Sequence, residues 1–136
     1  MLDRSQYLLK IRPDIPTTAI NETMGLNERF QNETLRPVLK FQNGLLIAVF
    51  KNYITKHKNK FQELSIEKRL LYIENAIQKD IKFRNSLKGI IIGAFTEEEY
   101  AIYIQDSSAL NKRMMNLVIK RLQDQILVFE EKALIH

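Results

Sequence analysis

Hydrophobic side chains recur once per helical turn in the middle of this chain, and this spacing limits the possible folds more than any other feature. The stripe comprises Leu46, Val49, Phe50, Tyr53, Ile54, His57 and Phe61. Such spacing places its members on one face of an α-helix. Two further long segments repeat the pattern, and no comparable alternation typical of a strand is present. The sequence therefore predicts an all-α fold, an irregular bundle of five or six helices with an extended N-terminal arm.

The chain divides into an N-terminal arm, residues 1–26, and a single helical domain, residues 27–136. Pro13 and Pro16 keep the residues before them out of the α region. We therefore expect an extended or loosely coiled arm, with room for a short turn at Ser5–Lys10. The apolar side chains of this arm require it to lie against the rest of the protein or against a partner.

Within the helical domain the apolar spacing predicts helices over 28–43, 45–58, 66–95, 97–105 and 109–131. Pro37 either kinks the first helix or opens a new one. We expect Gly44 to form a junction. The stripe shifts halfway through 66–95, which fits one bent helix or two abutting helices. Thr96 and Glu99 have the spacing of a capping box and predict a helix start.

Composition narrows the class of protein. A chain of 136 residues, 45% of them hydrophobic, can bury a core without disulfides or metal. It has no cysteine, which excludes disulfides and thiolate metal sites and fits a reducing cytosol. The start lacks a secretory signal pattern, and the longest uncharged apolar stretch is far shorter than the roughly 20 residues of a membrane-spanning helix. We expect a cytoplasmic protein without a membrane segment.

The residue types that carry enzyme chemistry are scarce or badly spaced. The two histidines are His57 and His136, and neither belongs to an HExxH or Glu-x-x-His motif. No serine lies in a G-x-S-x-G elbow. Three consecutive glutamates, residues 97–99, cannot all point at one ion from a helix, and the helix start explains them. We therefore expect no catalytic, metal-binding or cofactor-binding residues.

Two groups of polar residues remain as candidate contacts in a chain of net charge +5. Residues 97–116 have the layout of a helix–turn–helix, although Asn111 stands where that motif needs an apolar residue. The nucleic-acid contacts would be Ser108, Asn111, Lys112 and Arg113. The second group is a basic patch near the helix breaks, which comprises Arg36, Lys40, Lys82, Arg84 and Lys88. The usual explanation of such charges is the solvated face of an amphipathic helix.

Three stretches carry a resemblance to known proteins: residues 28–43 (ERFQNETLRPVLKFQN), 72–89 (YIENAIQKDIKFRNSLKG) and 107–116 (SSALNKRMMN). They resemble a family of short, uncharacterised bacterial proteins, some of which are called glyoxalase, and the resemblance covers nearly the whole chain. That name implies a metal-dependent lyase. Glyoxalase I-type enzymes are built from βαβββ modules and bind their metal through His and Glu, so no catalytic residue carries over to this chain.

Three functions stay open at this point. We favour a protein–protein interaction module that binds a protein partner or a second copy of itself, because some apolar residues lie off the main stripes. These residues are Leu45, Ile47, Ile92, Ile102 and Ile119. A contiguous exposed apolar patch would mark an interface. The alternatives are a nucleic-acid-binding protein and, by the family name alone, a glyoxalase-like lyase.

Overall fold

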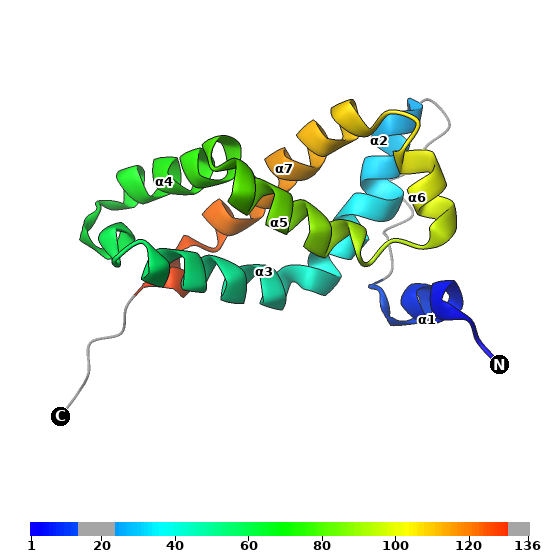
Figure 1. Ribbon diagram of the computed structural model, residues 1–136, viewed down its shortest axis with the longest axis horizontal. Helices are drawn as coiled ribbons and strands as arrows, with labels where there is room; N and C mark the ends of the chain where they lie inside the picture. Colours follow the sequence, from blue (N-terminus) through cyan, green and yellow to red (C-terminus); the bar gives the residue numbers. More distant parts are fainter. Residues whose placement is uncertain (14–23, 131–136) are drawn as a thin grey trace.

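The computed structural model describes residues 1–13 and 24–130, and these ranges contain helices and no strand (Figure 1). The prediction of an all-α fold is confirmed. The helices are α1 (Arg4–Ile11), α2 (Leu26–Phe30), α3 (Arg36–Lys56), α4 (Ile66–Lys79), α5 (Ile81–Ile92), α6 (Glu97–Tyr103) and α7 (Ser107–Asp124). A π-helical turn, Gln31–Leu35, joins α2 to α3, and 3₁₀ turns follow at Lys60–Glu63 and Ile126–Phe129. No helix among the described residues is long and apolar enough to cross a bilayer.

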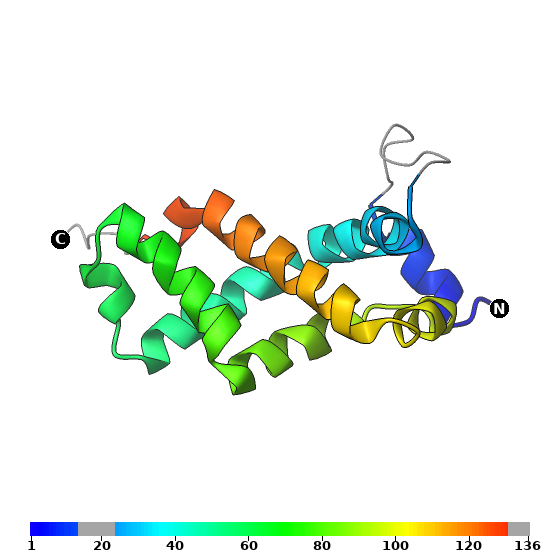
Figure 2. The same ribbon diagram turned by 90° about the horizontal axis from the view of Figure 1, so that it is seen from above.

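The body of the molecule consists of the longer helices α3, α4, α5 and α7, which pack on one another. Helices α1, α2 and α6 gather at one end of this body in both views (Figures 1 and 2). The 3₁₀ turn that follows α7 lies at the opposite end, close to the start of α4. The short helices are therefore collected at one end of the bundle, beside the start of α7 (Figures 1 and 2).

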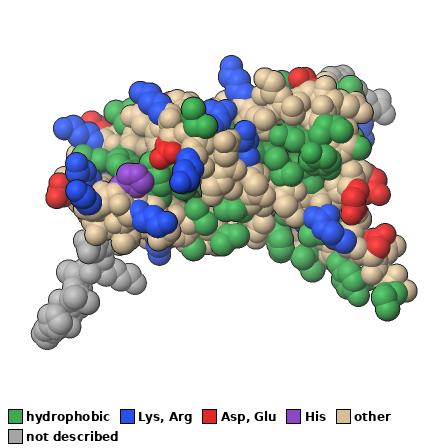
Figure 3. Space-filling model, in the orientation of Figure 1, with side chains coloured by type: hydrophobic (Ala, Val, Ile, Leu, Met, Phe, Trp, Pro, Cys, Tyr) green, Lys and Arg blue, Asp and Glu red, His purple; other side chains and the backbone are tan. Residues whose placement is uncertain are grey.

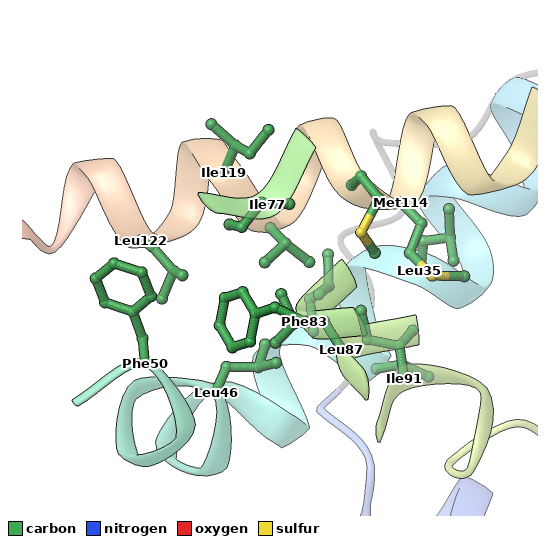
Figure 4. Packing of buried hydrophobic residues seen from close by; sticks show 14 of the residues in the cluster. Leu35, Leu46, Phe50, Ile77, Phe83, Leu87, Ile91, Met114, Ile119 and Leu122 are labelled. Atoms are coloured by element: carbon green, nitrogen blue, oxygen red, sulfur yellow. The ribbon is translucent and has the colours of Figure 1, made fainter. Parts of the chain in front are cut away.

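Phe50 of α3 is fully buried in the core (Figure 4), where its ring lies beside those of Tyr72 of α4 and Phe83 of α5. The Phe50 ring centroid lies 5.0 Å from that of Phe129 and 5.8 Å from that of Phe61. Burial of each such ring contributes about 2–3 kcal/mol. Of the predicted stripe, Leu46, Phe50, Ile54 and Phe61 are buried, Val49 and Tyr53 lie at the core margin, and His57 is exposed.

Pro37 lies in the first turn of α3, as the second alternative expects, but the helical path does not stop before it. A proline here lacks an N–H and clashes with the carbonyl four residues back in a regular helix. The π-helical turn directly before α3 is wider than an α-turn and accommodates the proline. The chain therefore follows one helical path from Leu26 to Lys56.

The expected junction at Gly44 is wrong, because α3 continues through it to Lys56. A glycine inside a helix costs roughly 0.5–1 kcal/mol relative to alanine. Leu39 and Leu46, on either side of Gly44, are almost fully buried in the core. Their burial outweighs the cost of the glycine and keeps the helix continuous.

Residues 66–95 form two helices, α4 and α5, that are separated at Asp80. The Asp80 backbone is extended, and its carboxylate accepts a hydrogen bond of 3.1 Å from the Phe83 N–H. Asp80 is thus an N-cap that starts a new helix. The expected last helix, 109–131, instead begins at Ser107 and ends at Asp124.

The extended N-terminal arm needs a correction, since α1 is a regular helix over Arg4–Ile11 and includes the expected turn at Ser5–Lys10. Asp3 and Gln6 form a capping box, in which each side chain accepts a hydrogen bond from the other residue's N–H. This D-x-x-Q spacing is visible in the sequence and is the signal that identifies α1. The parts of the predicted arm at 14–23, and His136, lie outside the described residues.

We expect Gly44→Ala to raise the free energy of unfolding by roughly 0.5–1 kcal/mol, because alanine restricts the unfolded chain and favours the helix. A Cβ added at Gly44 meets no atom within 4 Å. Urea denaturation measures the change. Gly93→Ala is the control, because its Cβ would lie 3.0 Å from the Gly89 carbonyl oxygen and should bring no gain. A loss of stability in Gly44→Ala would contradict the continuous α3.

Candidate interaction surface where α1 meets α6

Helix α1 docks onto the loop between α5 and α6 through its polar side. The Arg4 guanidinium donates hydrogen bonds of 2.8 Å to the carbonyl oxygens of Phe95 and Gly93. The Ser5 hydroxyl donates to the Glu97 carboxylate at 2.5 Å. These contacts join residues about ninety positions apart in the chain, so they fix the place of α1 on the body.

The central contact of this end is a buried ion pair between Arg12 and Glu99. Two nitrogens of Arg12 donate to the two carboxylate oxygens at 2.7 and 2.6 Å, and the side chains are 4% and 14% exposed. A third hydrogen bond from Arg12 reaches the carbonyl oxygen of Ala94. A bidentate arginine–carboxylate pair such as this one is among the strongest arrangements of charge-assisted hydrogen bonds.

Glu99 also receives hydrogen bonds from the body of the protein. The Thr34 hydroxyl, in the π-helical turn, donates to it at 2.9 Å, and the Thr96 N–H donates at 2.8 Å. The predicted capping box of Thr96 and Glu99 is confirmed. One carboxylate therefore holds together α1, the turn before α3 and the start of α6.

The pKa of Glu99 reflects these bonds. Burial alone would raise the pKa, but the hydrogen bonds from Arg12, Thr96 and Thr34 outweigh burial and hold it below its usual range. Glu99 is therefore ionised at neutral pH, as its pairing with Arg12 requires. The sequence predicts that the three glutamates at 97–99 serve only the helix start. This prediction is incomplete, because Glu97 also binds Ser5 and Glu99 also binds Arg12.

Because α1 docks by polar groups, three of its apolar side chains stay at the surface. Tyr7, Leu9 and Ile11 are between 53% and 59% exposed. On α6, Tyr100 and Ile104 lie one turn apart and are 47% and 55% exposed. Figure 3 shows hydrophobic side chains gathered at this end of the molecule.

One hollow links the two helices through Arg4. A shallow hollow is lined by Arg4 of α1 together with Ile92 and Tyr100. Tyr7 and Ile11 follow Arg4 at the spacing that shares one side of a helix. We call the surface formed by Tyr7, Ile11, Ile92, Tyr100 and Ile104 the α1–α6 surface.

The residues that lie off the predicted stripes differ in their exposure. Leu45 and Ile102 are exposed, Ile47 and Ile92 are partly buried, and Ile119 is buried in the core. Two of these five side chains, Leu45 and Ile102, are therefore at the surface. Of the five, only Ile92 belongs to the α1–α6 surface, because that surface depends on how α1 docks.

The four candidate nucleic-acid contacts are divided by the fold. Helices α6 and α7 are joined by a short turn, and Ser108 and Lys112 are exposed. The Asn111 side chain accepts a hydrogen bond of 2.6 Å from the Tyr103 hydroxyl. Arg113 donates to the side chain of Gln31 at 3.0 Å. Asn111 and Arg113 thus connect α7 to neighbouring elements.

The predicted basic patch comes from two helices. Lys82, Arg84 and Lys88 lie on α5, and Arg84 and Lys88 are partly buried. Arg36 and Lys40 are exposed on α3. Arg36 lines a groove with residues of α7, a helix that the predicted patch does not include.

His57 belongs to a cluster of side chains on the opposite part of α3. Its ring stacks on that of Tyr53 at a centroid distance of 4.0 Å, and the Tyr53 hydroxyl donates to Asp80 at 2.9 Å. Burial and this hydrogen bond raise the pKa of Tyr53, so the phenol stays protonated. Across the described residues, no group of three His, Cys, Asp or Glu side chains is placed to hold a metal ion.

No match was found for this chain among protein families, curated proteins or solved structures.

We expect Glu99→Gln to destabilise the protein by about 2 kcal/mol, because it leaves Arg12 buried beside a neutral group. Release of α1 should also speed trypsin cleavage after Lys10, which mass spectrometry follows. Glu98→Gln is the matched control, since Glu98 is exposed and has only a long 3.4 Å contact with Ser5. Equal cleavage rates in the two variants would contradict the role of Glu99.

The lowered pKa of Glu99 predicts a dependence on pH. A carboxylate with a lowered folded-state pKa contributes stability that is fully present above its ordinary value of 4.5 and lost as pH falls through the folded-state pKa. The difference in unfolding free energy between the unaltered protein and Glu99→Gln should therefore be largest above pH 4.5 and shrink below it. Urea titrations at a series of pH values measure it. A constant difference would contradict the assignment.

Proposed function

We propose that this protein is a helical protein-binding module that contacts its partner through the α1–α6 surface. The observation that carries the proposal is the exposure of large apolar side chains on two helices held together by the Arg12–Glu99 ion pair. Grouped apolar exposure of this kind is typical of protein interaction sites. Aromatic residues, here Tyr7 and Tyr100, are enriched in such interfaces.

The supporting contacts favour a preformed surface. The hydrogen bonds of Arg4, Ser5 and Arg12 fix α1, so little conformational freedom would be lost when a partner binds. The partner in this proposal is another protein or a second copy of this chain. Nucleic-acid binding and metal-dependent lyase activity stay alternative predictions, and the internal bonds of Asn111 and Arg113 weaken the first.

Charge substitutions on the surface test the proposal. We expect Ile11→Asp and Ile104→Asp to abolish association, because each places a carboxylate in a contact that must lose water. Ile81→Asp is the matched control, because Ile81 is 71% exposed and lies at the end of α5 far from α6. Sedimentation velocity measures self-association, and quantitative cross-linking in cells measures other protein contacts.

Association that is lost in Ile11→Asp and Ile104→Asp but kept in Ile81→Asp would support the proposal. Association that survives both α1–α6 variants would overturn it. So would a protein that stays monomeric and forms no cross-linked complex.

A further inference from the structure

A groove with a volume of about 230 Å³ runs between α3 and α7, away from the α1–α6 surface. Its floor includes Leu39 and Leu117. Its rim carries Arg36, Lys120, Arg121, Asp124 and Gln125. The groove shares no residue with the α1–α6 surface, so the inference from it does not depend on the proposed function.

The side chains of the groove are held in place by amides from both helices. Asn43 and Gln125 form a reciprocal pair, with hydrogen bonds of 2.9 and 2.8 Å between α3 and the residue that follows α7. Gln125 also donates to the carbonyl oxygen of Arg121 at 3.0 Å. The Arg36 Nε donates to Asn32 at 3.0 Å, which orients its guanidinium. These bonds fix the groove before a ligand arrives.

The charges of the groove are unbalanced. Three cations face one carboxylate, Asp124, which pairs with Lys120 at 3.6 Å. The ion pairs among the described residues include neither Arg36 nor Arg121. Burial and the nearby Arg36 lower the pKa of Arg121, although a guanidinium stays charged. Two like charges held close together repel, and an anion between them would remove this repulsion.

We propose that the groove binds a phosphate group between the guanidinium groups of Arg36 and Arg121. Arginine is suited to this ligand because its planar fork donates two parallel hydrogen bonds to phosphate oxygens. The leucine floor would take the apolar part of a phosphate monoester. The volume lies below the roughly 300–1,000 Å³ of most small-molecule sites, so the ligand is small. Free inorganic phosphate and a phosphate monoester present the same kind of phosphate oxygens to the two guanidinium groups, so both fit the proposal.

Titration calorimetry at constant ionic strength, with inorganic phosphate and with phenyl phosphate, tests the proposal. We expect saturable binding that weakens about tenfold or more in Arg36→Gln and in Arg121→Gln, because each variant loses charged hydrogen bonds to the ligand. Lys40→Gln is the matched control. It removes the same charge from an exposed position one turn along α3, outside the groove lining, and should change affinity less than about twofold. Circular dichroism melting verifies that each variant is folded.

Tighter binding of phenyl phosphate than of inorganic phosphate would support the site and indicate a monoester as its ligand. Equal affinity for both would support the site and indicate free phosphate. Absence of saturable binding by either probe would overturn the proposal. An equal loss of affinity in Lys40→Gln and the two arginine variants would overturn it as well, because binding would then follow net charge only.

Discussion

The ion pair of Arg12 and Glu99 determines where the first helix lies, and the shape of one end of the molecule depends on it. An isolated helix as short as α1 is barely stable in water. A buried ion pair adds little net stability unless hydrogen bonds satisfy its remaining atoms. Here Thr34, Thr96 and the Ala94 carbonyl supply such bonds, while the buried Nε of Arg12 has no hydrogen-bond partner among the described residues. The pair therefore acts as one part of a network that joins α1 to the body.

This mode of docking reverses the usual arrangement of an amphipathic helix. The body helices turn apolar stripes inward, as Leu46 and Phe50 of α3 do. Helix α1 instead turns Ser5 and Arg12 inward and leaves Tyr7 and Ile11 in contact with solvent. Such an arrangement leaves apolar surface area exposed after folding. For this reason we propose that the α1–α6 surface binds a protein partner.

The core could be predicted from the sequence because it depends on local periodicity, and residues such as Phe50 and Phe61 repeat with the helix. The capping box at Thr96 is likewise visible in the sequence, as are the D-x-x-Q spacing that starts α1 at Asp3 and the aspartate that starts α5 at Asp80. The residue that pairs with Arg12 could not be predicted from the local sequence pattern. Glu99 lies 87 positions away, and although the capping box singles it out from its two neighbours, nothing in the local pattern indicates that it binds Arg12. The placement of Arg36 and Arg121 in one groove has the same long-range origin.

Hydrogen exchange of the α1 amides in the unaltered protein tests the central claim most directly. If polar contacts hold α1 on the body, its hydrogen-bonded amides should exchange about a hundredfold or more slowly than in an unfolded chain. Exchange of these amides at the unfolded rate, while α3 and α7 stay protected, would show that α1 is not docked and would contradict the account.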